Sequence, residues 1–169
     1  MIKVAKAKVG QEELDAIQSV FEAGWLGMGN FTLKFEEALQ AFLGAEQVVA
    51  VNTGTSALHL ALLALGIGPG DEVVLPSLTF VASFQAVSAT GATPIPCESD
   101  PHTLLMDLDD AQKRITSRTK VIMPVHYCGQ ACDMERILSW REKYNVRIIE
   151  DAAHAFGSFY KNKKIGSFG

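Results

Sequence analysis

The sequence lacks several features that mark special classes of protein. It has only three cysteines, Cys97, Cys128 and Cys132, and so sparse and odd a set argues against a disulfide framework and for a reducing compartment. No apolar run approaches the length that spans a bilayer. Residues 1–13 show no apolar core of a secretory signal. We therefore expect a cytoplasmic protein that does not associate with membranes.

A strong charge of one sign is also lacking. Fifteen basic residues oppose nineteen acidic ones, which leaves a net charge of −4. This balance gives no basic patch for nucleic acid or for an anionic membrane, so we expect no partner of either kind. Apolar residues make up 48% of the chain and charged residues 20%, which excludes a disordered or fibrous protein. A length of 169 residues is that of one globular domain.

Apolar residues recur at helical spacing in two N-terminal segments, 12–23 and 31–43, and each segment is followed by a glycine. Short apolar strands then alternate with helical segments along the rest of the chain. We predict strands at 47–51, 72–75, 93–96, 120–125 and 146–149, and helices at 56–65, 80–89, 108–115 and 134–144.

The predicted strands are continuous apolar blocks, such as Val48–Val51 and Val146–Ile149, rather than alternations of polar and apolar residues. Strands of this kind are covered on both faces. The sequence therefore predicts an α/β fold, a three-layer α/β/α sandwich with a mostly parallel sheet. Residues 159–165 predict a closing hairpin.

Ligands of an open α/β sheet bind beyond the carboxyl ends of its strands. Polar or aromatic clusters follow four of the predicted strands, and we expect them to meet at one edge of the sheet. They are Asn52–Ser56, Pro76–Phe80, His126–Gly129 and Glu150–His154.

The first cluster joins a strand to the start of a helix and contains Gly54, Thr55 and Ser56. Glycine permits close approach of a ligand, and free amides at a helix N-terminus suit a phosphate. The alternative is an ordinary capped turn, with Thr55 or Ser56 as the N-cap. The segment is neither a dinucleotide-binding glycine motif nor an ATP-type phosphate loop.

Asp151 follows an apolar strand and precedes two alanines, where a carboxylate is costly without a cationic or hydrogen-bonding partner. The partner could be a ligand cation, a metal or a distant side chain. A protonated pyridine nitrogen of pyridoxal phosphate (PLP) would be such a cation, whereas a helix N-cap is the alternative to a ligand. His154 could face the same ligand or be satisfied within the core. Phe80 could stack on a planar cofactor or pack in the core.

A metal site is the weakest reading of these clusters. Cys128 and Cys132, with His126 and Asp133, have loose spacing, and no second Cys/His pair accompanies them. We predict no metal.

Taken in order, several motifs together resemble the sugar aminotransferase family called DegT/StrS. The similarity runs from Gly24 to the last residue. It is carried by Asn52–Leu62, Gly68–Ala82, Pro124–Gly129, Glu150–Ala155, and Tyr160–Lys161 with Ile165–Gly169.

The resemblance implies a fold type I enzyme that uses pyridoxal 5'-phosphate to aminate a keto sugar carried on a nucleotide. An amino donor such as glutamate and a homodimer are implied as well. Trp25 and Leu26 match a segment near the sugar-nucleotide pocket. The implied cofactor contacts are Gly54, Thr55 and Ser56 to the phosphate, Phe80 to the ring, Asp151 to the ring nitrogen and His154 to the phenolic oxygen.

One departure from the family concerns the catalytic lysine. Family members are about twice as long, and their Schiff-base lysine follows the Gly166–Gly169 motif; none of the lysines of this chain matches its context. The implied organisation of 1–169 is an N-terminal segment and part of the PLP-binding large domain, without the small C-terminal domain. We expect no catalytic residue here and no transamination by this chain alone. Two alternatives are a PLP-dependent sugar dehydratase, in which histidine replaces that lysine, and a non-catalytic assembly module.

Overall fold

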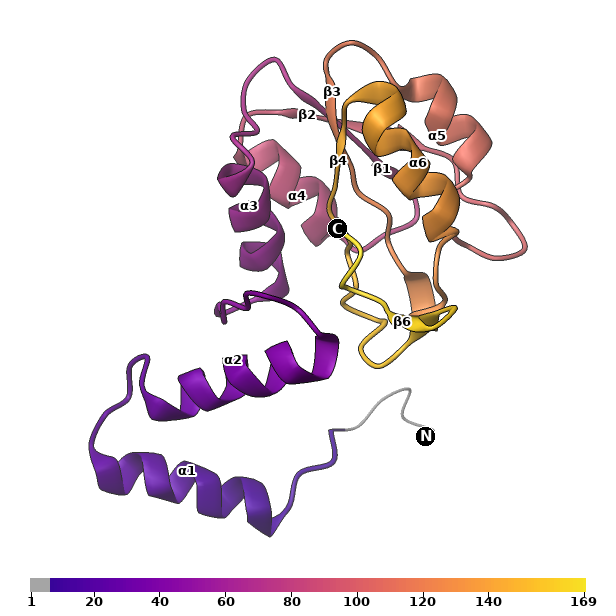
Figure 1. Cartoon of the computed structure of the whole chain (residues 1–169). Coiled ribbons are helices and arrows are strands. Elements are labelled where there is room, and N and C mark those ends of the chain that lie inside the picture. The colour runs from indigo at the N-terminus through magenta and orange to yellow at the C-terminus, as the bar shows by residue number, and fades with distance from the viewer. Residues whose placement is uncertain (1–6) are drawn as a thin grey trace, which may run out of the picture. The chain divides into compact units, whose positions relative to one another are not determined.

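The computed structural model describes residues 7–169 (Figure 1). Residues 1–6, on which part of the prediction of no secretory signal rests, lie outside the described residues. The chain divides into two compact units, residues 1–50 and residues 51–169.

The first unit contains two helices, α1 (Gln11–Ala23) and α2 (Asn30–Leu43). No residue of either helix is buried. Each helix ends at a glycine in the left-handed region, Gly24 at φ 67° and Gly44 at φ 69°, where residues with a Cβ are strained. Large apolar side chains on both helices are exposed: Leu14, Ile17, Phe21, Leu33 and Phe35.

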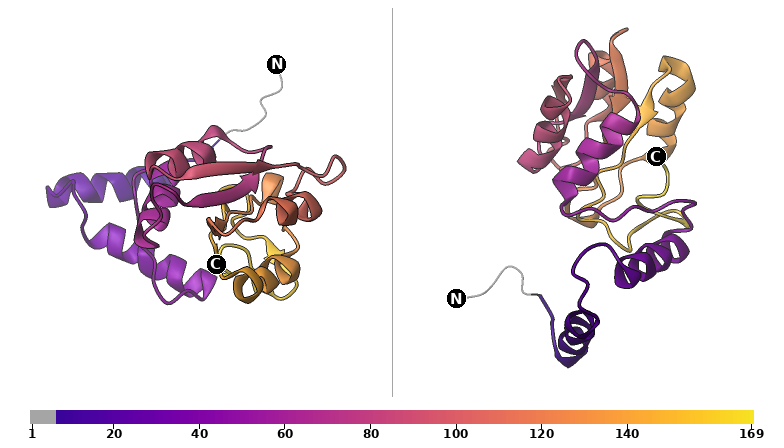
Figure 2. Two further views of the ribbon diagram at one scale, coloured as in Figure 1. Left: turned by 90° about the horizontal axis from the view of Figure 1, so that it is seen from above. Right: turned by 90° about the vertical axis from the view of Figure 1, so that its left-hand side faces the viewer.

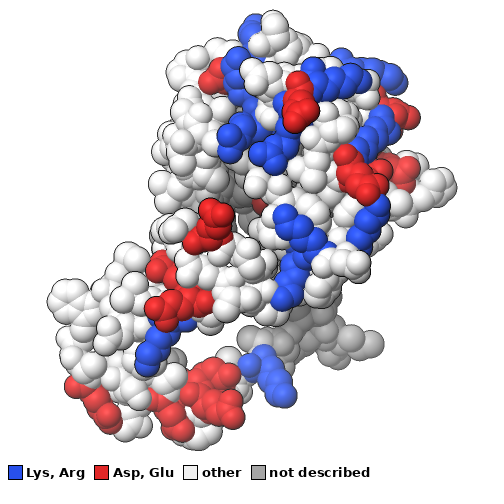
Figure 3. Space-filling view, in the orientation of Figure 1, with Lys and Arg blue, Asp and Glu red and all other residues white. Residues whose placement is uncertain are grey.

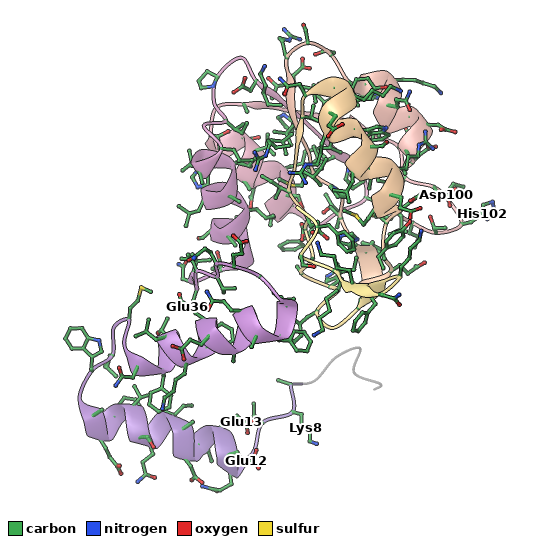
Figure 4. All side chains as sticks on the ribbon, in the orientation of Figure 1. Lys8, Glu12, Glu13, Glu36, Asp100 and His102 are labelled. Carbon is green, nitrogen blue, oxygen red and sulfur yellow. The ribbon has the colours of Figure 1, made fainter. Side chains whose placement is uncertain are left out.

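Two hydrogen bonds shape the connections of this unit. The indole Nε1 of Trp25 donates to the carbonyl of Met28 at 2.9 Å and closes the turn between the helices. Glu36 projects from α2 (Figure 4), and its carboxylate accepts the amide of Ala50 at 2.7 Å. This bond holds the segment after α2 against that helix.

The second unit is built on a four-stranded sheet in the order β2-β1-β3-β4, in which every pair is parallel. Its strands are β1 (Glu72–Pro76), β2 (Thr93–Cys97), β3 (Thr119–Ile122) and β4 (Arg147–Ile148). Pro94 and Pro96 lie in β2, an outer strand of this sheet. Proline has no amide hydrogen to donate to a neighbouring strand and is therefore tolerated at the edge of a sheet.

Successive residues of the central strands enter two different cores, because side chains alternate across a strand. Val73 and Leu75 of β1 pack in one core, and Val74 packs in the other. One core includes residues of α3 (Gly54–Ala64) and α4 (Val81–Ala89), and the other includes residues of α5 (Leu108–Arg114) and α6 (Met134–Tyr144). Figures 1 and 2 show these helix pairs on opposite sides of the sheet. The predicted three-layer α/β/α sandwich is confirmed.

Aspartates are the N-caps of α5 and α6, the two helices of the core that contains Val74, called here the second core. Asp107 accepts the amides of Asp109 and Asp110 at the start of α5, and Asp133 accepts the amide of Arg136 at the start of α6. Between β2 and α5, Asp100 shapes the loop that Figure 4 labels, where its Oδ1 accepts the amide of His102 at 2.9 Å.

The predicted strand at 47–51 is wrong. This segment belongs to no sheet among residues 7–169, and Val49 is 75% exposed. A strand exists only where a neighbour accepts and donates its backbone hydrogen bonds, and local β propensity cannot supply that neighbour. The other predicted strands and the helices appear within a few residues of their expected bounds.

The predicted hairpin is confirmed by β5 (Phe159–Tyr160) and β6 (Lys163–Lys164), which pair antiparallel. Its turn contains Lys161 at φ 52°, a left-handed residue without the usual glycine.

The surface carries both signs of charge. On the face that Figure 3 shows, Lys and Arg side chains gather over the second unit, while acidic side chains gather over α1. The first turn of α1 contains Glu12 and Glu13, which Figure 4 labels. Within residues 7–169, no helix combines the length and the apolar character that crossing a membrane requires.

Candidate active site

A cavity of about 180 Å³ lies in the second unit, beyond the carboxyl ends of the parallel strands. This is the edge at which the sequence places its polar clusters. The volume suits a small ligand with a single ring, because pockets for larger ligands run to about 300–1,000 Å³. The cavity is lined by Gly54, Thr55, Leu58, Thr79, Phe80, Ala82, Val125, Tyr127, Asp151, Ala153 and His154.

The N-terminus of α3 forms one wall of the cavity. Thr53 is the N-cap: its Oγ1 accepts the amide of Ser56 at 3.0 Å and donates to the Ser56 hydroxyl. The alternative of Thr55 or Ser56 as the N-cap is therefore wrong, because the helix begins at Gly54, two or three residues earlier than those caps require. Gly54 and Thr55, the first residues of the helix, line the cavity. A Cβ on Gly54 would meet no atom within 4 Å, so the wall is open on this side.

Asp151 places a carboxylate on the cavity although only 8% of the residue is exposed. Its Oδ2 accepts a hydrogen bond of 2.8 Å from Ser83, and its Oδ1 accepts the amide of Ala153 at 3.3 Å. The Ser83 hydroxyl is in turn 2.8 Å from that of Thr79. Since Ser83 donates to the aspartate, Thr79 donates to Ser83. Among residues 7–169, no Lys, Arg or His forms an ion pair with Asp151.

The backbone of Asp151 is held as firmly as its side chain. Its amide donates to the carbonyl of Pro124 at 2.9 Å, and its carbonyl accepts the amide of His126 at 3.0 Å. These bonds form an isolated parallel bridge with Val125. The parallel pairing of β3 and β4 thus resumes, beyond the ends of both strands, at Asp151.

Aromatic rings border the cavity. Phe80 precedes α4 and is 72% exposed, so the reading of Phe80 as a core residue is wrong. Tyr127 and His154 meet edge to face with ring centroids 5.8 Å apart. A planar ligand would find an exposed aromatic face at Phe80 and a polar ring edge at His154.

The structure brings together five of the predicted cofactor-binding residues: Gly54, Thr55, Phe80, Asp151 and His154. Ser56 does not line the cavity, because its amide and hydroxyl are bound to Thr53 in the helix cap. Trp25 and Leu26, the predicted substrate-binding residues, lie in the first unit, where both are exposed.

Sequence reasoning missed Ser83, which contacts Asp151, and the lining residues Leu58 and Ala82. A signal for Ser83 existed. It lies four positions after Thr79, a spacing that lets two hydroxyl side chains meet near a helix start, and the two hydroxyls are 2.8 Å apart.

None of the three cysteines lines the cavity. Burial raises the pKa of Cys97 and of Cys132 to about 12 each, so both are thiols at neutral pH. His126 is bound to Glu150 and to the amide of Cys132. Within the part of the chain that the structure describes, no group of three or more His, Cys, Asp or Glu could hold a metal ion.

The model of the DegT/DnrJ/EryC1/StrS aminotransferase family matches residues 7–169. The chain belongs to this family. The match covers both units and includes every residue that lines the cavity.

Individual relatives agree with the family assignment. GDP-perosamine synthase of Caulobacter vibrioides is 46% identical over 169 residues, which are 99% of this chain and 46% of the relative. The crystal structure of the aminotransferase TlmJ from Streptoalloteichus hindustanus superposes with a TM-score of 0.95 at 40% identity, covering 100% of this chain and 47% of TlmJ. NtdA from Bacillus subtilis with bound cofactor PMP superposes with a TM-score of 0.84 at 37% identity, covering 86% of this chain and 34% of NtdA. The chain therefore spans less than half the length of these relatives.

Proposed function

We propose that the second unit is the cofactor-binding part of a PLP-dependent aminotransferase that acts on a nucleotide-linked keto sugar. The observation that carries this proposal is Asp151, a nearly buried carboxylate on a cavity, which no cation among residues 7–169 neutralises. The hydrogen bonds from Ser83 and Ala153 offset part of the cost of burying this charge, and a cationic ligand would offset the remainder. The pyridinium nitrogen of PLP is a cation of the required size and shape.

The remaining cavity residues fit the same cofactor. Gly54 and Thr55 present the N-terminus of α3, where amide groups and the helix dipole favour a phosphate. Phe80 offers an exposed ring for stacking on the pyridine. His154 lies on the cavity beside Tyr127, from where its ring could bond the phenolic oxygen. Ser56 supports the phosphate end indirectly, through the Thr53 cap.

When bound, PLP acts as an electron sink for the amino group transfer. The residues of this chain bind and orient it. Asp151 keeps the ring nitrogen protonated, and Ser83 keeps the Asp151 carboxylate in place. None of the described residues that line the cavity is a lysine. The catalytic amine would therefore come from a part of the protein other than these lining residues. This agrees with the sequence, in which no lysine has the surroundings of the family's Schiff-base lysine.

The proposal also covers the substrate, the amino donor and the oligomeric state. A sugar nucleotide is the proposed amino acceptor, a glutamate-like amino acid the proposed donor, and Trp25 and Leu26 the proposed substrate contacts. The exposed apolar side chains of α1 and α2 support a homodimer, because so many large apolar groups are usually covered. A cytoplasmic location accords with the three free cysteines.

Binding of pyridoxamine phosphate (PMP) tests the proposal. PMP has the ring and phosphate of PLP but no aldehyde, so it cannot react with surface lysines. We expect the chain to bind PMP in isothermal titration calorimetry and Asp151→Asn to weaken binding at least tenfold, since the variant lacks the carboxylate. Asp133→Asn removes a carboxylate that caps α6, away from the cavity lining, and should leave the affinity unchanged. Equal affinity of Asp151→Asn and wild type would contradict the proposal.

A further inference from the structure

Glu150, the residue before Asp151, carries a second buried carboxylate that does not line the cavity. Its side chain is only 3% exposed. Oε1 accepts the amides of Phe168 at 2.6 Å and Gly169 at 2.9 Å, and Oε2 accepts the amide of Gly166 at 3.0 Å. Both oxygens are therefore committed to the turn at 166–169.

His126 supplies the fourth donor to this carboxylate. Its Nδ1 accepts the amide of Cys132 at 3.1 Å, which assigns the proton to Nε2 and makes the imidazole neutral. Nε2 lies 3.1 Å from Oε2 of Glu150 and donates to it. The His126 ring is fully buried and bonded at both nitrogens, so it holds the carboxylate in one orientation.

The four donors keep Glu150 charged. Burial raises the pKa of this carboxyl group, but the hydrogen bonds from His126 and from the amides of Gly166, Phe168 and Gly169 outweigh burial, and the pKa lies below its ordinary value. A charged acceptor makes these hydrogen bonds stronger than neutral ones.

The turn lies directly against the strand end that Glu150 follows. A Cβ on Gly169 would come within 2.9 Å of the carbonyl oxygen of Ile148, and a Cβ on Gly166 would lie 3.5 Å from the Cβ of Ala152. The adjoining Ile165 is buried at 2% exposure. This close approach allows the amides of the turn to reach a side chain on the neighbouring strand end.

Glu150 and Asp151 are consecutive and their side chains have different environments. Asp151 faces the cavity and Glu150 the turn, as successive residues of extended backbone do. The amide of His126 also donates to the carbonyl of Asp151 at 3.0 Å. The backbone of Asp151 is thus held on two sides. Glu150 precedes it on the strand end after β4, and His126 bonds to it from the strand end after β3.

We propose that Glu150 is a positioning residue: its carboxylate, oriented by His126, ties the turn at 166–169 to the strand end and so fixes the place of Asp151 on the cavity. The inference rests on the proposed function in taking Asp151 as the group whose place matters for the cofactor. Glu150 does not line the cavity, and its carboxylate bonds only to the turn and to His126.

Glu72 provides a matched control. It is also a buried, hydrogen-bonded carboxylate, which bonds to Thr116, Thr119 and Arg118 at the amino end of β1, the end remote from the cavity. A general loss of stability would follow from Glu72→Gln as well as from Glu150→Gln. Effects on the turn and on the cavity should follow from Glu150→Gln alone.

Amide hydrogen exchange measures the two regions without any ligand. We expect Glu150→Gln, compared with Glu72→Gln at equal distance below each variant's melting temperature, to raise exchange at least tenfold in both 166–169 and 151–155. In Gln an NH2 group, which donates and cannot accept, replaces one of the two carboxylate oxygens. At least one amide of the turn therefore loses its acceptor, and the remaining bonds lose their charged partner. Glu150→Asp, which keeps the charge on a shorter side chain, should restore part of the protection. Faster exchange confined to 166–169, or equal exchange in the two Gln variants, would overturn the positioning role.

A change on the turn itself gives a second test if Glu150→Gln does not fold. Gly169→Ala places a Cβ against the carbonyl of Ile148 and should displace the amide that Glu150 accepts, whereas Gly68→Ala meets only an atom at 3.8 Å. We expect Gly169→Ala alone to raise exchange in 151–155 and to weaken PMP binding about tenfold. Unchanged exchange there would overturn the inference. Absence of PMP binding to the wild-type chain would overturn the proposed function, and the exchange comparison would still decide the role of Glu150.

Discussion

The hydroxyl of Ser83 donates a hydrogen bond of 2.8 Å to Oδ2 of Asp151, although 68 positions separate the two residues. Ser83 lies in α4 and is fully buried, and Asp151 follows β4. The bond connects the helix layer on one side of the sheet to the strand end at its carboxyl edge. It leaves the other carboxylate oxygen of Asp151 with one long hydrogen bond, to Ala153, and therefore able to accept a bond from a ligand.

Removal of this hydroxyl should affect both stability and binding. Ser83→Ala takes a donor from a nearly buried carboxylate, and a hydrogen bond to a charged group is worth about 1.5–3 kcal/mol. We expect a loss of that order in the free energy of unfolding, measured by urea denaturation, and a several-fold weaker affinity for PMP. Ser139→Ala removes an exposed hydroxyl that bonds within α6 and should change neither quantity. Equal behaviour of the two variants would show that Asp151 does not depend on Ser83.

The cap of α3 should influence phosphate binding specifically. Thr53→Ala removes the acceptor for the amide of Ser56, which costs about 1 kcal/mol of stability and loosens the helix N-terminus on the cavity. Asp107→Ala removes the cap of α5 at a similar cost. We expect only Thr53→Ala to weaken binding of PMP in calorimetry. A parallel loss of affinity in both variants would assign the effect to stability alone.

Glu72 should make stability depend on pH on the acid side. The hydrogen bond from Thr116 holds its pKa below the ordinary value against the opposing effect of burial, with help from Arg118. A carboxyl group with a lowered folded-state pKa stabilises the fold above its unfolded pKa, and this contribution is lost as the pH falls through the folded pKa. As the pH is lowered from about 5, the wild type should lose more stability than Glu72→Gln. Thermal unfolding of both proteins at a series of pH values measures the difference. Parallel pH curves would contradict the assignment.

The three cysteines should differ sharply in reactivity. Cys128 is exposed, whereas Cys97 and Cys132 are buried, with thiol pKa values raised to about 12. Because the thiolate is the reactive form, Ellman's reagent should modify one thiol quickly in the native chain and three after denaturation. Cys128→Ser should abolish the fast reaction. Two or more fast thiols in the native chain would show that the second core is more open than the structure describes.

The layered fold and the position of the site could be predicted from local patterns. Apolar blocks such as Val146–Ile149 predict a sheet covered on both faces, and the residues that follow the strands fall on the carboxyl edge. The segment at 47–51 marks the limit of this reasoning. Its composition favours a strand, but pairing depends on a neighbour that residues 7–169 do not provide.

The order of residue types along the chain was enough to determine the α/β architecture, the family resemblance and five of the residues that line the cavity. These features depend on short-range periodicity and on motifs, which a sequence carries directly. Only the tertiary structure decided that Ser83 supports Asp151, that Thr53 rather than Ser56 caps α3, and that Glu150 binds the turn at 166–169. The bonds of Ser83 and Glu150 join segments distant in the sequence, and the choice of cap depends on the residue at which the backbone turns into the helix, so the packed chain determines all three.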